Sequence, residues 1–473
     1  MEKVKSIHFV GIKGVGMAPL AIIAKEAGIK VTGSDIGEEF ITDEVLQKVG
    51  VIPFVGFLKE HVGSVDLVVT TGAHGGFDNE EVLEAKRKGI TVLTQGEAVG
   101  VFMEGTILGQ KDTVGISVAG SHGKTTTTAM IATILKECHQ DPSFLVGTAN
   151  VSSLGSCGHF GTGKYFVAEA DEYATEPIYD TTPKLLWQHP KIALFTNIEL
   201  DHPDLYKSVE EVRAAFLQFA NNLPYNGTLV VNGDDGQIKK LCNDYKGTVI
   251  SFGYSPRNDY VLKRVNISGS QTFFWVETKG TSLGEFVVSV PGEHNALNAV
   301  GALVVGIECG FSVEKMKHGL SVFKGSKRRF EFVAKTRSGI LLYDDYAHHP
   351  TEIKKTLAAF RKSFPKHKII CIFQPHTFSR TKILFDQFLH AFHDAEQVII
   401  TDIYPSLREH SDSSISSKQL VEAMGRFHKN VIFLPELSHV VEYTKQKNAG
   451  EDTILVTMGA GDIYKIHDQL KRL

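Results

Sequence analysis

The chain has 473 residues, of which 42% are hydrophobic, 22% charged and 9% aromatic, a composition close to that of globular proteins with substantial cores. Fifty Lys and Arg against 54 Asp and Glu give a net charge of −4, so we expect no nucleic-acid partner and no binding to an anionic membrane. At roughly 100–200 residues per domain, this length predicts about three domains.

The first part of the chain alternates predicted strands and helices. A strand over residues 6–10 runs through a glycine turn into an amphipathic helix over 17–27, and a second strand follows at 30–33. This βαβ pattern predicts a parallel sheet covered by helices. No apolar run reaches the ~20 residues of a membrane span, and the five cysteines form no CxxC pair. We therefore expect a protein of the cytoplasm.

A glycine cluster joins the first predicted strand to the first helix. Gly11, Gly14 and Gly16 have the spacing G-x-x-G-x-G, and Asp35 follows at the end of the next strand. Backbone N–H groups of such a turn at a helix N-terminus bind diphosphates. Because the dinucleotide spacing is G-x-G-x-x-G, the cluster leaves three possibilities open: another nucleotide diphosphate, a nicotinamide cofactor, or a purely structural turn.

A second glycine loop begins after a predicted strand over residues 113–119. The sequence GSHGKTTTT, residues 120–128, leads into a helix. Glycines let the backbone curl around phosphate oxygens, Lys124 supplies a positive charge, and the Thr125 hydroxyl can bind Mg²⁺. Val118 stands where the ordinary P-loop has its first glycine, so the match is to the shorter G-x-x-G-K-T form. This loop predicts a nucleotide triphosphate site.

Acidic residues and histidines follow this loop near the ends of two further predicted strands. The clusters are EADEY, with Glu169, Asp171 and Glu172, and ELDHPD, with Asp201, His202 and Asp204. Carboxylates and imidazole beside a phosphate loop are the groups that hold Mg²⁺ while it contacts phosphate oxygens. Strand-end acids also occur as solvated charge, so the order of the three motifs carries the prediction.

Four more polar motifs lie in the second half of the chain. Asn295 and Asn298 share one face of a predicted helix, and a basic, glycine-containing linker with Arg328 and Arg329 precedes a third α/β segment near residue 326. That segment contains DDYAHHP and QPHTFSRT, with Asp344, Asp345, His348, His349, His376 and Arg380. Each motif alone could equally be a helix cap, a buried polar residue or solvated charge.

Taken together, these motifs resemble the Mur ligase family, the ATP-dependent amide-forming enzymes of peptidoglycan precursor synthesis. The resemblance covers essentially the whole chain, because HFVGIKGVGM, AGSHGKTTT, EADEY, TNIELDHPD, PGEHNALNA, GSKRRF, DDYAHHPTEI and QPHTFSRT occur in that order. It implies an α/β fold of three domains: a Rossmann-like N-terminal domain over 1–110 for a UDP-sugar, a central P-loop ATPase-type domain with a parallel or mixed sheet over 111–325, and a Rossmann-like C-terminal domain over 326–473 that binds the amino acid and closes on the site.

The resemblance also implies roles for single residues. Lys124, Glu169, His202, Arg329 and Asp345 would carry catalysis, with one Mg²⁺ held by Thr125 and Glu169 and a second held by His202. ATP would contact Gly120, Ser121, His122, Gly123, Lys124, Thr125, Thr126, Asn295, Arg329 and Asp345, while Asn298 would stabilise the helix of Asn295 as part of that site. Gly11, Gly14, Gly16, Ser34 and Asp35 would surround the UDP group, and Arg380, His376 and His348 would face the substrate carboxylate.

Within the family, the motifs are most similar to those of the ligases that join L-alanine to UDP-N-acetylmuramate through an acyl phosphate. We therefore expect ATP and Mg²⁺ as cofactors, these two compounds as substrates, and a monomer or weak homodimer. Two alternatives stay open: a recycling ligase that joins a whole murein tripeptide to the same sugar nucleotide and, remotely, a nicotinamide-dependent dehydrogenase. A dehydrogenase would not explain the GSHGKTTTT loop.

Overall fold

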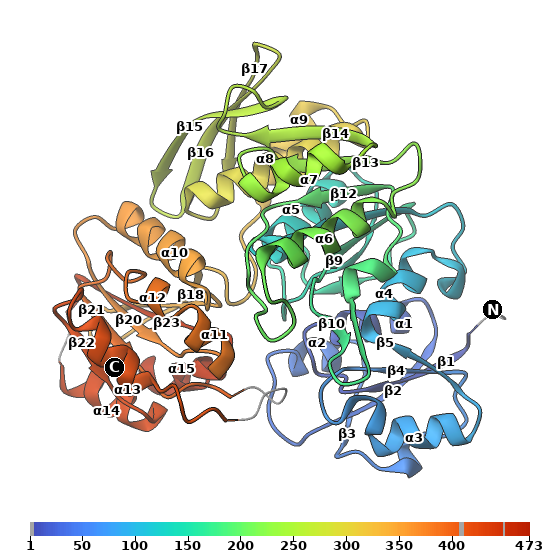
Figure 1. Ribbon diagram of the computed structural model, residues 1–473, viewed down its shortest axis with the longest axis horizontal. Coiled ribbons are helices and arrows are strands. Elements are labelled where there is room, and N and C mark those ends of the chain that lie inside the picture. The colour runs from blue at the N-terminus through green and yellow to red at the C-terminus, as the bar shows by residue number, and fades with distance from the viewer. Residues whose placement is uncertain (1–3, 406–410, 448–449) are drawn as a thin grey trace.

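A computed structural model describes residues 4–405, 411–447 and 450–473, and its main sheets form three bodies arranged around a shared centre (Figure 1). Each body places helices on the faces of its sheet, as alternating strands and helices require. The predicted α/β class with three domains is confirmed. No helix among the described residues is long and apolar enough to cross a membrane.

The N-terminal body, drawn in blue in Figure 1, is a parallel sheet with the strand order β3-β2-β1-β4-β5. Strands β2 and β3 follow β1 on one side, whereas β4 and β5 lie on its other side. Ligands bind beyond the carboxyl ends of the strands at a point where the strand order switches sides in this way. Its elements are β1 (Ser6–Val10), α1 (Ala18–Glu26), β2 (Lys30–Asp35), α2 (Asp43–Lys48), β3 (Phe54–Val55), β4 (Leu67–Thr70), α3 (Glu80–Arg87), β5 (Thr91–Thr94) and α4 (Gln95–Met103).

The central body is built on a long mixed sheet with the order β17-β16-β15-β14-β13-β12-β6-β9-β7-β8. Helices α5, α8 and α9 cover one face, while α6 and α7 cover the other. The strands are β6 (Val114–Ala119), β7 (Ser143–Leu145), β8 (Gly158–His159), β9 (Tyr165–Ala170), β12 (Ile192–Phe195), β13 (Thr228–Asn232), β14 (Thr248–Gly253), β15 (Tyr260–Ser268), β16 (Gln271–Thr278) and β17 (Thr281–Val288). The helices are α5 (Lys124–Glu137), α6 (Val209–Ala220), α7 (Gly236–Asp244), α8 (Glu293–Glu308) and α9 (Val313–Val322).

An antiparallel extension ends this sheet, where the βαβ pattern alone would predict only parallel strands. Strands β15, β16 and β17 pair antiparallel through two-residue turns. Lys279 and Gly280 both have positive φ, 49° and 75°, the conformation that two-residue hairpin turns adopt to match the strand twist. The alternating apolar residues of these strands face α8 and α9, so the extension completes the core on that side.

The C-terminal body, orange to red in Figure 1, has the strand order β18-β19-β23-β20-β21-β22, parallel except for β18. Apolar clusters lie on both faces of this sheet. Its elements are β18 (Glu331–Lys335), β19 (Leu341–Asp345), α10 (Pro350–Ser363), β20 (Lys368–Phe373), α11 (Phe378–Ile383), α12 (Phe385–Phe388), β21 (Gln397–Ile400), α13 (Ser417–Met424), β22 (Val431–Phe433), α14 (Leu437–Gln446), β23 (Thr453–Met458) and α15 (His467–Leu470).

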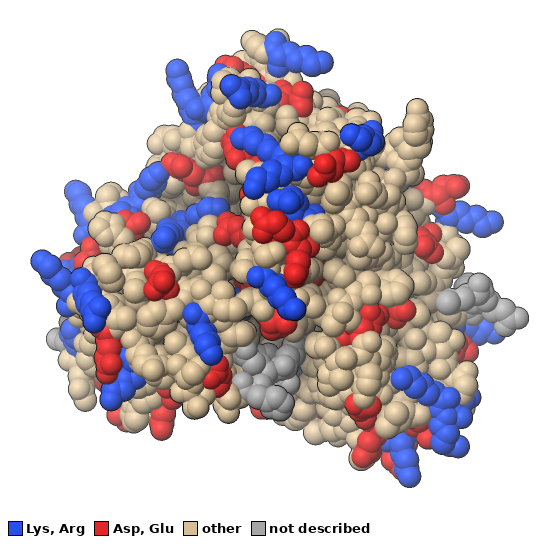
Figure 2. Space-filling model, in the orientation of Figure 1, with Lys and Arg blue, Asp and Glu red and all other residues tan. Residues whose placement is uncertain are grey.

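The N-terminal and central bodies share one apolar core. Helix α1 packs against β7 and β8, and Leu145 and Phe166 join the N-terminal cluster. Gly158 makes this contact possible, because a Cβ there would clash with the backbone of Pro19. The C-terminal body instead meets the others through polar pairs, such as Arg380 with Asp201. On the face in Figure 2, positive and negative side chains are interspersed.

Candidate functional site

The phosphate loop lies between the end of β6 and the start of α5. Gly120 and Gly123 have φ of 145° and 84°, a conformation that costs a residue with a Cβ free energy. The loop therefore curves tightly and presents the N-terminus of α5, where unpaired N–H groups and the helix dipole favour anions. Thr126 lies in the first turn of that helix, which Lys124 begins.

Lys124 is the cation of this loop. Its ammonium donates hydrogen bonds to the carbonyl of Gly120 at 2.6 Å and to the carboxylate of Glu172 at 2.7 Å. Burial alone would lower the pKa of Lys124, but the nearby carboxylates of Glu172 and Asp171 raise it above its usual value. The side chain is therefore charged at neutral pH and held at the mouth of the phosphate loop.

Two acidic groups lie beside Lys124, and the end of β9 and the residues after it supply the carboxylates of both. In the first, the hydroxyl of Thr125 donates a hydrogen bond to Glu169 at 3.0 Å. In the second, ligand atoms of Asp171, Glu172 and His202 all lie within 4.8 Å of one another. Thr125 and Glu169, predicted to hold one cation, thus lie together, and His202, predicted to hold a second, lies with Asp171 and Glu172, which the predicted set lacked.

The donor set suits a hard divalent cation. Glu172 Oε1 is buried and makes no hydrogen bond, so this oxygen has a lone pair for a ligand. Burial lowers the pKa of His202, which keeps its imidazole neutral at pH 7, the form that binds metals. Burial raises the pKa of Glu169, and a bound cation would favour its ionised form.

A crevice beside the loop brings together most residues predicted to contact ATP. It is lined by His122, Gly123, Thr126, Asn197, Val290, His294, Asn295, Asn298, Phe323, Gly325, Ser326, Arg329, Phe330, Asp345, Glu352, Lys355 and Thr356. The amide of Asn295 donates to the carbonyl of Pro291 at 2.7 Å, and Asn298 lies against Gly123. In this structure Asn295 thus braces the start of α8, the role predicted for Asn298, while both asparagines line the crevice and Asn298 also lies against the phosphate loop.

Arg329 and Asp345 close this crevice from the C-terminal side. Both oxygens of Asp345 accept backbone hydrogen bonds, from Phe330 and Ala347 at 2.7 and 2.8 Å. Burial raises the pKa of Asp345 to about 6. Burial would lower the pKa of Arg329, but the carboxylates of Glu352 and Asp345 raise it, so its guanidinium brings a positive charge to the crevice.

A larger cavity of about 410 Å³ lies where all three bodies meet. Among its lining residues are Gly14, Gly16, Ser121, Lys124, Thr125, Glu169, Asp171, His202, Arg329, His348, Glu352, His376 and Arg380. The phosphate loop, both acidic groups, the first glycine cluster and the C-terminal histidines therefore share one space. Such convergence of polar and titratable groups in a cavity is typical of an active site.

The first glycine loop approaches this cavity through Gly14 and Gly16. The side chains of Ser34 and Asp35, predicted to surround the UDP group, are 0% and 1% exposed. Asp35 accepts the backbone N–H groups of Lys13 at 2.7 Å and Ile36 at 2.8 Å. The Ser34 hydroxyl donates to buried Glu81 at 2.6 Å. Both residues thus hold the loop and strand end in place from within the protein, as does Gly11, where the chain passes close to Thr71.

The residues predicted to face a substrate carboxylate lie on the C-terminal wall. Arg380 lies in the first turn of α11 and contacts Asp201 of the central body, with its Nε 3.1 Å from the carboxylate oxygen Oδ1. Its Nη1 lies 3.1 Å from His376 Nδ1. Burial and Arg380 lower the pKa of His348 to about 4, so this histidine is neutral at pH 7. Asp201 was recognised in its motif but was not predicted as the partner of Arg380.

Comparison with known proteins identifies the family. The Mur ligase family catalytic domain matches residues 6–106, the Mur ligase middle domain residues 118–306, and the Mur ligase glutamate ligase domain residues 328–461. UDP-N-acetylmuramate–L-alanine ligases from Geobacter sp. strain M21 and Desulfitobacterium hafniense strain Y51 are 37% and 38% identical to this chain. The alignments cover 99% and 98% of this chain and 97% and 99% of those proteins.

Solved structures agree with this assignment. The UDP-N-acetylmuramate–alanine ligase of Thermotoga maritima is 28% identical, with a TM-score of 0.79 over 98% of this chain and 97% of its own. A murein peptide ligase from Psychrobacter arcticus is 25% identical, with a TM-score of 0.72 over 99% of both chains. With full-length relatives at this identity and a site in which the family's motifs converge, the chain belongs to the Mur ligase family.

Proposed function

We propose that this chain joins L-alanine to UDP-N-acetylmuramate at the expense of ATP, in the synthesis of peptidoglycan precursors. The observation that carries the proposal is the cavity in which a phosphate loop with a charged Lys124, two acidic groups and a second glycine loop meet. Full-length relatives that bear the name of this activity support it. Family membership removes the dehydrogenase alternative, because Mur ligases are ATP-dependent amide-forming ligases.

The chemistry requires ATP because an amine does not displace oxide from a carboxylate. A carboxylate oxygen of the sugar's lactyl group attacks the γ-phosphorus of ATP, so that an O–P bond forms, the bond to the bridging oxygen breaks and ADP leaves. The amine of L-alanine then attacks the carbonyl carbon of the acyl phosphate. As the C–N bond forms, the amine loses a proton and the C–O bond to phosphate breaks. No nucleophile from the protein is needed.

The residues of the chain would act by positioning and by charge. Lys124 and Arg329 bring positive charge to the side of the phosphate loop where the γ-phosphoryl group would lie, and backbone N–H groups of the loop would bind phosphate oxygens. Thr125 and Glu169 would hold one Mg²⁺ and His202, with Asp171 and Glu172, a second. When bound, Mg²⁺ would neutralise charge that develops on the phosphate oxygens.

The two organic substrates would enter from opposite sides of the cavity. The loop of Gly14 and Gly16 would bind the diphosphate of UDP-N-acetylmuramate through its backbone. His348, His376 and Arg380 would face the carboxylate of the amino acid from the C-terminal wall. Because Arg380 also contacts Asp201 across the interface, binding at this wall would depend on how the C-terminal body closes over the cavity. Closure would exclude water and protect the acyl phosphate from hydrolysis.

The second candidate is the ligase that joins a murein tripeptide to the same sugar nucleotide. Its favouring observation is the similarity to the murein peptide ligase of Psychrobacter arcticus. Identity to the alanine ligases is higher, at 28–38% against 25%, so we favour L-alanine. An alanine site needs only a small pocket, and a single methylene or hydroxyl changes its selectivity by about 1–3 kcal/mol.

Phosphate release from ATP in the presence of UDP-N-acetylmuramate distinguishes these candidates. We expect turnover with L-alanine, slower turnover with glycine and L-serine, and none above background with L-Ala-γ-D-Glu-meso-diaminopimelate. Faster turnover with the tripeptide than with L-alanine at equal concentration would identify the recycling ligase instead. No phosphate release with any amine would reject both.

A further inference from the structure

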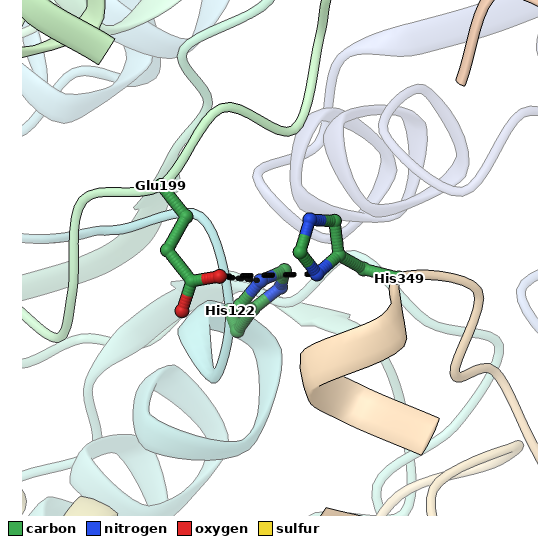
Figure 3. Close-up of side chains that lie close together, drawn as sticks. All are labelled: His122, Glu199 and His349. Atoms are coloured by element: carbon green, nitrogen blue, oxygen red, sulfur yellow. Dashed lines mark ion pairs between the residues drawn. The ribbon is translucent and has the colours of Figure 1, made fainter. Parts of the chain in front are cut away.

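A cluster of titratable side chains joins the phosphate loop to the start of α10. It consists of His122 from the loop, Glu199 from the segment after β12, and His349 and Glu352 at the beginning of α10; we call it the junction cluster. Figure 3 shows the imidazoles of His122 and His349 next to each other, both facing the Glu199 carboxylate. Glu199 Oε2 lies 3.6 Å from His122 Nε2 and 3.8 Å from His349 Nδ1. The cluster therefore spans the interface between the central and C-terminal bodies.

His122 lies between carboxylates of the two bodies. Its side chain is 6% exposed, and its Nδ1 is 3.4 Å from Glu352 Oε1. Neither ring nitrogen makes a hydrogen bond. The contacts of the ring nitrogens are therefore the ion pairs with the Glu199 and Glu352 carboxylates. Burial would lower the pKa of His122, yet Glu352, Glu199 and, farther away, Asp201 raise it to about 10. His349, the other group against this ring, has its pKa lowered by burial and is neutral.

Glu352 contacts more of the site than any other member of the junction cluster. Its Oε2 accepts the N–H groups of His348 at 3.2 Å and His349 at 3.4 Å, which fixes the start of α10. Its Oε1 faces His122 and also lies 3.4 Å from Arg329 Nη1. One buried carboxylate thus contacts both the phosphate loop and the arginine that enters the nucleotide crevice.

A metal ion is the other occupant that two histidines and a glutamate suggest. The donor atoms are already engaged, however. His349 Nδ1 accepts the N–H of Thr351 at 3.2 Å as the cap of α10, and Glu199 Oε2 accepts the Thr351 hydroxyl at 2.8 Å. A metal would have to displace both hydrogen bonds and the charge on His122. The contacts therefore favour an ionic role.

We propose that Glu352 is a positioning residue for ATP: through His122 and Arg329 it holds the phosphate loop and the crevice arginine in register when the C-terminal body closes. This rests on the proposed function only in taking ATP as the ligand. The arrangement makes nucleotide affinity depend on closure, because opening would separate Glu352 from His122. Opening would leave His122 with Glu199 of its own body and without Glu352, so the ion pair with Glu352 favours the closed state.

The test compares binding of a non-hydrolysable ATP analogue with Mg²⁺ by calorimetry. The full-length variants are Glu352→Gln, His122→Gln and the double variant. Glutamine keeps an oxygen for the N–H groups of His348 and His349, so the start of α10 is retained. Glu293→Gln is the matched control, because Glu293 pairs with Lys362 across the same interface in an exposed pair outside the cavity. Each single variant should bind at least ~10-fold more weakly, the control within about twofold.

Double-variant binding no weaker than that of the poorer single variant would support coupling, whereas additive losses would overturn it. Wild-type affinity in Glu352→Gln would overturn this inference alone, while no analogue binding by the unaltered chain would overturn it together with the proposed function. NMR titration of the folded-state His122 resonance gives a second readout: its pKa should fall in Glu352→Gln while the resonance stays at its folded position. Zn²⁺ binding that is lost in both His122→Gln and His349→Gln would instead make the junction cluster a metal site.

Discussion

The chain contains two glycine loops of the same design that differ in their charges. In each, a buried parallel strand ends at glycines and leads into a helix, β1 into α1 and β6 into α5. Beneath the first loop, the Asp35 carboxylate accepts two backbone N–H groups. At the second, the Lys124 ammonium is held by the Gly120 carbonyl and Glu172. The shared backbone suits phosphate groups, but the side chains assign the loops different tasks.

The difference shows why only one loop is equipped for phosphoryl transfer. The first loop also has a lysine, but the ammonium of Lys13 donates to the carbonyl of Glu38 at 2.8 Å and lies 3.4 Å from Asp43. Its charge is directed away from the cavity that Gly14 and Gly16 line. The first loop is therefore suited to holding a diphosphate that does not react, whereas Lys124 and the acidic groups can stabilise charge during transfer.

The largest effect is expected from removing the cation of the second loop. Lys124→Ala should lower kcat by at least ~100-fold, because charge on the γ-phosphoryl group loses its main side-chain partner. Lys136→Ala is the control. Lys136 lies at the far end of α5, where its ammonium donates to the Ser153 carbonyl, so this variant should leave kcat unchanged. Phosphate-release kinetics measure both. Near-normal turnover in folded Lys124→Ala would make the two loops equivalent.

The cation site beside the second loop should also respond to substitution. His202→Ala should raise the Mg²⁺ concentration needed for half-maximal activity by about 10–100-fold, since it removes a neutral imidazole from the donor set with Asp171 and Glu172. Activity is measured against Mg²⁺ concentration, with exposed His318→Ala on α9 as the control. An unchanged Mg²⁺ requirement would remove His202 from the site.

The first loop should respond in binding rather than in chemistry. Asp35→Asn leaves one carbonyl oxygen where two backbone N–H groups now have a carboxylate, so UDP-N-acetylmuramate should bind about 10-fold more weakly, a loss of ~1.4 kcal/mol. ATP binding should not change. Asp66→Asn is the matched control, because Asp66 also accepts two backbone N–H groups, at the opposite end of the same sheet.

Calorimetry on these variants also separates a UDP-sugar site from a nicotinamide site. Tight NADH binding that competes with UDP-N-acetylmuramate would contradict the role given to the first loop. A loss of ATP affinity in Asp35→Asn would show that the two loops do not act independently.

The smallest effect concerns the contact between the regions that carry the two loops. His159 of β8 lies 2.8 Å from Glu26 of α1 and 3.1 Å from Asp141, and these carboxylates raise its pKa. Because the folded-state pKa is raised, the stabilisation is complete below the unfolded pKa near 6.5 and is lost as pH rises through the folded value. His159→Gln should lower Tm by on the order of 1 °C at pH 6, and by less at pH 9. A lowering of Tm that instead grows with pH would show that the two carboxylates do not stabilise the protonated form of His159.

The strands and helices of the βαβ units and the residues around each glycine loop were predictable from local patterns in the chain. Strand β1 occupies the predicted residues, and Lys124, Thr125, Glu169 and His202 line one cavity. These features are readable because a strand, a glycine turn and a helix start are local in the chain, and motifs at the carboxyl ends of neighbouring parallel strands necessarily meet.

The pairing of groups far apart in the chain is visible only once the chain is folded. Glu352 reaches His122 across 230 positions of the chain, and Arg380 reaches Asp201 across 179. Ser34 contacts Glu81 inside the sheet rather than the cavity. No local pattern encodes such pairs, because an ion pair depends on how whole bodies pack and on which carboxylates that packing buries. The chemistry of each glycine loop could therefore be predicted from the sequence. The coupling between the phosphate loop and the C-terminal body could not, because it depends on how the bodies pack.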